Sequence, residues 1–170
     1  MDAASLYLSA TTMAAWGPRG QPLTVRCDPS RAKTSFYGTL DLKTGHELVT
    51  QVDTMNAEAT AGHLNTLLTT YPDVPILLFW DRAPWHRGAE IRAVLEANPR
   101  LELLVFPTAA PDLNPQEHVW KARRRAVSHN HTERRLPGLA ERFKTHLTST
   151  SFHSSFLVRY GWYLVCPEST

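Results

Sequence analysis

The stretch ILLFWD at residues 76–81 places five consecutive apolar residues before a single carboxylate. This run is too short for a helix and is typical of a β-strand that is covered on both faces and ends at Asp81. Residues 89–97 follow with the apolar spacing of a helix, and LELLVF at residues 101–106 repeats the pattern of a covered strand. The region therefore predicts a β-α-β unit with parallel strands.

The flanking sequence extends this unit to a whole α/β domain. Further strands are expected at residues 5–8, 34–41 and 47–52, the last two as a hairpin. Further helices are expected at residues 56–70, from Asn114 to about Ser128, and from about Leu136 to Leu147. Glycine and proline predict loops at residues 16–22 and 107–111. Hairpin strands followed by alternating helices and parallel strands favour an α/β layer architecture.

Composition narrows the class of protein. The chain has 170 residues, 42% hydrophobic and 20% charged, which suffices for one domain with a hydrophobic core. We expect a cytoplasmic protein, because the chain has neither a secretory signal nor an apolar run of roughly 18 residues, the length of a membrane helix. Cys27 and Cys166 lack CxxC spacing, which argues against a disulfide framework or a thiolate zinc site.

Charge is distributed unevenly along the chain. Residues 1–117 carry 9 basic and 13 acidic groups, whereas residues 118–170 carry 9 basic and 3 acidic groups. This asymmetry indicates a polyanionic partner for the basic part, or equally a solvated surface of arginine-rich helices.

Two carboxylates stand where functional groups gather in such folds. Asp81 follows a strand, and ligands of open α/β sheets collect at the carboxyl ends of strands, although an Asp there is also an ordinary turn residue. Glu117 lies in DLNPQE (112–117), where Asn114 predicts a helix N-cap and Pro115 the first helical turn. The alternative role of Glu117 is a capping box, in which its side chain reaches back to the Asn114 amide.

The helix after Glu117 carries a basic row. Lys121, Arg124 and Arg125 follow Glu117 at spacings of four, seven and eight, so they share its face. This row could hold DNA phosphates, or it could be the solvated face of an amphipathic helix. The residues expected to turn toward the core are Val119, Trp120, Ala126 and Val127.

Other side chains have two interpretations. Trp85 and His86 could line a cleft near Asp81 or pack in the core, and the histidines lack the spacing of a zinc finger. Trp120, Tyr160 and Trp162 are expected in the core rather than stacked on bases.

Several segments form one ordered pattern. FWDRAPWH (79–86) and FPTAAPDLNPQEHVW (106–120) contain its most specific part, LNPxE at residues 113–117, and DAAS (2–5), residues 16–22 and FYG (36–38) precede them. Together they resemble the catalytic domain of the DDE-superfamily transposases of mariner-like bacterial insertion sequences.

The resemblance implies a ribonuclease-H-like (integrase/transposase) fold, with a mixed sheet flanked by helices, over residues 1–150 and a C-terminal tail over residues 151–170. The family's metal-binding acidic residues would fall on Asp2, Asp81 and Glu117, with 35 residues between the last two. They would bind two Mg²⁺ ions, for which Mn²⁺ can substitute, because hard ions prefer carboxylate oxygens. The expected DNA contacts are Lys121, Arg124, Arg125, Arg82 and His86.

The sequence also departs from the family pattern. Ala3 stands where the family usually has Glu, and Arg82 where Asn is common. Only Met1 precedes Asp2, so we expect a first strand without its upstream half and no helix-turn-helix region for reading transposon ends.

The leading hypothesis is a transposase catalytic domain that cuts DNA strands and joins the freed 3′-hydroxyl to target DNA. Its expected partners are double-stranded DNA, at transposon ends and target, and other transposase protomers, with no membrane. One alternative is a catalytically dead remnant that binds only DNA or a transposase. Another is a different ribonuclease-H-like nuclease, which explains LNPxE poorly.

Overall fold

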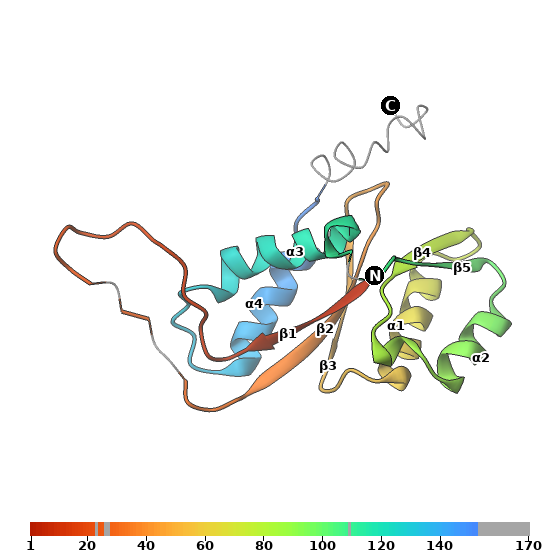
Figure 1. Ribbon diagram of the computed structural model, residues 1–170, viewed down its shortest axis with the longest axis horizontal. Helices are drawn as coiled ribbons and strands as arrows, with labels where there is room; N and C mark the ends of the chain where they lie inside the picture. The colour runs from red at the N-terminus through yellow and green to blue at the C-terminus, as the bar shows by residue number, and fades with distance from the viewer. Residues whose placement is uncertain (23, 26–27, 109, 153–170) are drawn as a thin grey trace.

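The computed structural model describes residues 1–22, 24–25, 28–108 and 110–152. Its elements follow the predicted α/β order (Figure 1). The strands are β1 (Asp2–Tyr7), β2 (Lys33–Leu40), β3 (Glu47–Val52), β4 (Ile76–Trp80) and β5 (Leu101–Val105). The α-helices are α1 (Ala57–Thr70), α2 (Ala89–Ala97), α3 (Pro115–Arg123) and α4 (Leu136–Thr148). Short 3-10 turns lie at Pro84–His86 and Pro111–Leu113, and a π-helical turn at Arg124–Ser128.

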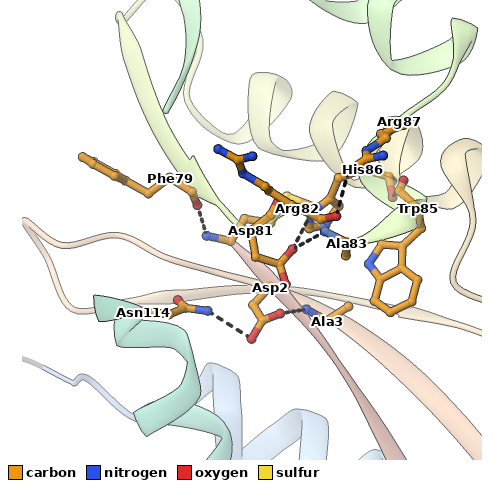
Figure 2. A network of polar contacts seen from close by, with 12 residues as sticks. Asp2, Ala3, Phe79, Asp81, Arg82, Ala83, Trp85, His86, Arg87 and Asn114 are labelled. Atoms are coloured by element: carbon orange, nitrogen blue, oxygen red, sulfur yellow. Dashed lines mark hydrogen bonds and ion pairs between the residues drawn. The ribbon is translucent and has the colours of Figure 1, made fainter. Parts of the chain in front are cut away.

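The strands form an antiparallel part and a parallel part. β1, β2 and β3 pair antiparallel, with Asp2 opposite Gly38. β4 and β5 pair in parallel, as the predicted β-α-β unit requires. The amino group of Met1 donates a hydrogen bond of 2.7 Å to the Phe79 carbonyl oxygen, so the start of β1 lies beside β4 (Figure 2). The two parts of the predicted mixed sheet therefore meet where β1 begins.

Successive side chains of a strand point to opposite faces of the sheet, so neighbouring residues of β1 and β2 pack against different helices. Ala4, Leu6 and Phe36 lie in a core with α3 and α4, whereas Tyr37 lies in a second core with α1, α2 and β4. Figure 1 shows the same division, with α3 and α4 beside β1 and α1 and α2 beside β4 and β5. Asp2 has the parity of Ala4 and Leu6 and therefore faces α3.

The prediction that β4 and β5 are covered on both faces is wrong for the residues that the structure describes. Leu78 and Leu101 are buried against α1 and α2, but Leu77, Leu104 and Val105 are 54%, 45% and 43% exposed. For Leu77 and Leu104 the reason is that α1 and α2 cover only the other face of this pair, while α3 and α4 pack on the antiparallel strands. Val105 is the last residue of β5 and is exposed at the end of the strand.

The helix expected from Asn114 to about Ser128 is interrupted. Regular α3 ends at Arg123, and the π-helical turn follows. A π turn is wider than an α turn and shifts the phase of the residues after it. Val119, Trp120 and Val127 are buried as predicted, but Ala126 is exposed.

Residues 16–22 contain no helix or strand, as predicted, and Gly20 has a φ of 83°, which glycine tolerates. The predicted tail at 151–170 lies outside the described residues apart from Ser151 and Phe152, as do Cys27, Cys166, Tyr160 and Trp162. In the described part of the chain, no helix combines the length and apolar character needed to cross a membrane.

Candidate active site

Three elements present the predicted acidic residues at one place in the fold. Asp2 is the first residue of β1, Asp81 follows the last residue of β4, and Glu117 lies in the first turn of α3. The hydrogen bond between Met1 and Phe79 brings the first two elements together. Figure 2 shows Asp2 below Asp81 and its turn, with Asn114 at the start of α3 beside Asp2.

Asp2 is buried, with 7% of its surface exposed. One carboxylate oxygen, Oδ1, accepts a hydrogen bond of 2.7 Å from the Ala3 amide, and the other, Oδ2, accepts one of 3.2 Å from Asn114 Nδ2. Burial raises the pKa of Asp2 to about 6, and the negative charges of Glu117 and Asp81 contribute to the increase. Asp2 is therefore close enough to Asp81 and to Glu117 to interact electrostatically with each of them.

The Asp81 side chain closes a turn and is also partly exposed to solvent. Its Oδ1 accepts a hydrogen bond of 3.0 Å from the Ala83 amide and lies 2.8 Å from His86 Nδ1, while 46% of its side chain remains exposed. Both interpretations of the sequence therefore apply, because one oxygen closes the turn and the side chain still reaches solvent.

His86, a predicted DNA contact, is buried beside Asp81. Its ring stacks on Trp80 at a centroid distance of 4.7 Å, and 2% of its side chain is exposed. Burial lowers the pKa of His86, although Asp81 acts in the opposite direction. This geometry favours a role in orienting Asp81 over direct contact with DNA.

Glu117 is exposed and does not form the capping box. The Asn114 amide, which the capping box would use, donates instead to the Pro111 carbonyl oxygen over 3.0 Å. The predicted N-cap itself is present, since Asn114 Oδ1 accepts from the Gln116 amide. The Glu117 carboxylate therefore does not cap its own helix and faces solvent.

The basic row is also at the surface. Lys121 is exposed on α3, Arg124 and Arg125 are exposed in the π-helical turn that follows it, and Arg82 is exposed in the turn after Asp81. Arg123 differs from its neighbours, because it is buried, lies over the Phe152 ring and contacts His146. Four of the five predicted DNA contacts are thus accessible, and the fifth is His86.

The sequence analysis missed a buried polar pair behind the site. Gln116 Nε2 donates to Glu47 Oε1, and Gln116 Oε1 accepts a hydrogen bond of 3.0 Å from the Leu40 amide. Burial raises the pKa of Glu47 to about 8. Gly38 makes room for this pair, since a Cβ there would lie 2.3 Å from Glu47 Oε1 and 2.6 Å from Gln116 Nε2. No local pattern signals it, although Gly38 inside a strand could have suggested close approach of other groups.

The donor set fits a hard divalent cation. Asp2, Asp81 and Glu117 offer only carboxylate oxygens, and a cation would offset both the burial and the neighbouring negative charges that raise the pKa of Asp2. Within the described residues, no three Asp, Glu, His or Cys side chains are yet gathered closely enough to hold an ion. Metal binding would therefore require the three carboxylates to move closer together.

Comparison with known proteins gives consistent matches. A family model described as "DDE superfamily endonuclease" matches residues 1–139. The chain is also similar to the "Insertion element IS630 uncharacterized 39 kDa protein" of Shigella sonnei, with 25% identity over 131 residues. That match covers 76% of this chain but 38% of the relative, so the chain spans well under half of the relative's length.

Solved structures match nearly the whole chain. The Mos1 mariner paired end complex with Mg matches with a TM-score of 0.68 and 17% identity, covering 99% of this chain and 54% of that chain. The Mos1 transposase catalytic domain with Raltegravir and Mn matches with a TM-score of 0.61 and 16% identity, covering 99% and 77%. These likenesses confirm the predicted fold class, the ribonuclease-H-like fold of transposase catalytic domains.

Proposed function

Because the chain belongs to the DDE superfamily endonucleases, we propose that it is a transposase catalytic domain that cleaves DNA strands and joins the freed 3′-hydroxyl to target DNA. The similarity to an insertion-element protein supports this choice over other ribonuclease-H-like nucleases. The proposed domain covers residues 1–150, slightly more than the family match. Its place of action would be chromosomal or plasmid DNA in the cytoplasm.

The observation that carries the proposal is that β1, the end of β4 and the first turn of α3 bring three carboxylates to one place in the fold. Asp2, Asp81 and Glu117 come from positions up to 115 residues apart, yet the charges of Asp81 and Glu117 both raise the pKa of Asp2. Such unfavourable clustering has no benefit for folding, whereas it is expected where carboxylates share cations.

We assign Asp2, Asp81 and Glu117 as ligands for two Mg²⁺ ions, with Mn²⁺ as a substitute. Bound ions would neutralise charge on the attacking and leaving oxygens of the phosphodiester. Asp81 would use Oδ2, since Oδ1 is held by Ala83 and His86. Asp2 would bind an ion with the orientation of its carboxylate set by Ala3 and Asn114.

The accessible basic residues would bind the DNA backbone. Lys121 follows Glu117 on α3, Arg124 and Arg125 begin the π-helical turn that continues it, and Arg82 follows Asp81 in the chain. Contacts of this kind give sequence-independent, salt-sensitive affinity. The proposed partners are duplex DNA, at transposon ends and target, and further transposase protomers. The Mos1 paired-end complex contains a transposon end, which supports this assignment by analogy of fold.

Nicking of supercoiled plasmid in Mg²⁺ or Mn²⁺ tests the proposal. Asp81→Asn and Glu117→Gln are expected to abolish metal-dependent nicking. Asp73→Asn and Glu96→Gln are matched controls, because they make the same changes at exposed acids elsewhere in the fold. Equal nicking by the parent and both site variants would refute the proposal.

A second candidate is a protein that binds DNA or a transposase without cleaving DNA. The observation favouring it is that the three carboxylates are not gathered at metal-binding distance in the described part of the chain. It predicts salt-sensitive DNA binding that Asp81→Asn and Glu117→Gln leave intact, with no nicking by the parent.

A further inference from the structure

Asn114 uses both ends of its side-chain amide. Its Oδ1 accepts a hydrogen bond of 3.1 Å from the Gln116 amide and caps α3, while its Nδ2 donates one of 3.2 Å to Asp2 Oδ2. The side chain is 5% exposed, so both contacts are shielded from water. An N-cap needs only an acceptor oxygen, which leaves the contact with Asp2 without a role in helix formation.

The residue type at position 114 suits this double use. Serine and aspartate cap helices as well as asparagine does, but only asparagine adds an amide donor on the same short side chain. The other oxygen of Asp2 is held by the Ala3 amide within β1. The orientation of Asp2 Oδ2 therefore depends on Asn114 (Figure 2).

The backbone around Asn114 is itself fixed. The Asn114 amide donates to the Pro111 carbonyl oxygen, and Gln116 ties the first turn of α3 to Leu40 in β2 and to Glu47 in β3. The first turn of α3, which carries Glu117, is thus held against β1 and β2 by side-chain amides.

We propose that Asn114 is a positioning residue that holds the Asp2 carboxylate in a fixed orientation, toward which Asp81 and Glu117 would move when the metal binds. The inference rests on the proposed function, since it concerns the same metal site. Partners that orient metal-binding side chains typically change metal affinity or activity by about 10–100-fold when removed. A residue that only caps α3 would change stability and leave metal affinity unaltered.

The test compares two capping asparagines. Asn114→Ser keeps a capping oxygen but is too short to reach Asp2. Asn56→Ser makes the same change at the N-cap of α1, where Asn56 Oδ1 accepts from the Ala59 amide over 2.7 Å. Mn²⁺ affinity is measured by electron paramagnetic resonance of the free ion, and thermal unfolding is measured without metal.

We expect similar unfolding temperatures for both serine variants, with unchanged Mn²⁺ affinity in Asn56→Ser and affinity weakened by about 10–100-fold in Asn114→Ser. Asn114→Thr, which also keeps a cap, replaces Asn114→Ser if the latter unfolds. Mn²⁺ affinity within about twofold of the parent in a folded Asn114 variant would overturn the inference, because loss of a partner that orients a metal ligand costs about tenfold or more.

Asp81→Asn and Glu117→Gln in the same titration separate this inference from the proposed function. If they lose Mn²⁺ binding while Asn114→Ser retains it, the inference about Asn114 fails and the metal site stands. If the parent does not bind Mn²⁺, or both acidic variants bind it like the parent, the metal site and the inference fail together.

Discussion

Replacing Gly38 by alanine is expected to destabilise the fold where β2 packs against Glu47, Gln116 and Trp120. The new Cβ would lie 2.3 Å from Glu47 Oε1, 2.6 Å from Gln116 Nε2 and 2.6 Å from Trp120 Cη2, all inside van der Waals contact. Trp120 is 1% exposed and cannot move without disturbing the core of α3 and α4. The relief must therefore come from Glu47 and Gln116, at the cost of their mutual hydrogen bond.

The expected loss of unfolding free energy combines two effects. Overpacking a dense core costs about 1–3 kcal/mol. Leaving a buried polar group without its partner costs about 1–3 kcal/mol. We expect a total of about 2–6 kcal/mol, a large part of the roughly 5–15 kcal/mol that stabilises a typical domain.

Urea unfolding followed by circular dichroism measures this loss, and Gly62→Ala is the matched control. Apart from its chain neighbours and the nearby backbone of α1, no atom of the described residues lies within 4 Å of a Cβ built at Gly62, which is exposed on α1. Alanine there should stabilise the protein by about 0.5–1 kcal/mol, because glycine is the poorer helix former. A Gly38→Ala variant within about 0.5 kcal/mol of the parent, the range of neutral surface changes, would refute the packing argument.

Three further measurements follow from the charges of the site. Glu47→Gln should gain stability relative to the parent as pH rises from about 5 to 8, and no further above pH 8. Burial raises the pKa of Glu47 in the folded state from 4.5 to about 8, so between these values Glu47 ionises only in the unfolded state, which favours unfolding of the parent. Urea unfolding at several pH values checks this, and an unfolding free energy that varies with pH in the same way in both proteins would contradict it. Mn²⁺ at 100 times its dissociation constant should stabilise the parent by about 2.7 kcal/mol and should not stabilise Asp81→Asn, which thermal unfolding with and without the ion reports. Changing both Lys121 and Arg124 to Gln should reduce the magnitude of the slope of log DNA affinity against log salt concentration by about 2, since each neutralised phosphate contributes about 0.9. An unchanged slope would show that DNA binds to another surface.

The sequence by itself determined the order of elements and the positions of the acidic residues. The apolar run at residues 76–80 predicted β4, and Asn114 with Pro115 predicted the start of α3, because strand periodicity and helix capping are local properties. The family followed from short motifs in order, and the family model confirms it over residues 1–139. The assignment of Asp2, Asp81 and Glu117 as metal ligands remains a prediction.

Only the tertiary structure decided which of these residues touch and which of them face water. Asn114 donates a hydrogen bond to Asp2, 112 residues away in the sequence, and the buried His86 side chain contacts Asp81. The exposed side chains of Leu77 and Leu104 also contradict the expectation of a strand pair covered on both faces. Each outcome depends on how α3 and α4 pack on β1 and β2, and on which face α1 and α2 cover. Local patterns cannot specify such packing, because they record the periodicity of one segment and carry no information about its partner.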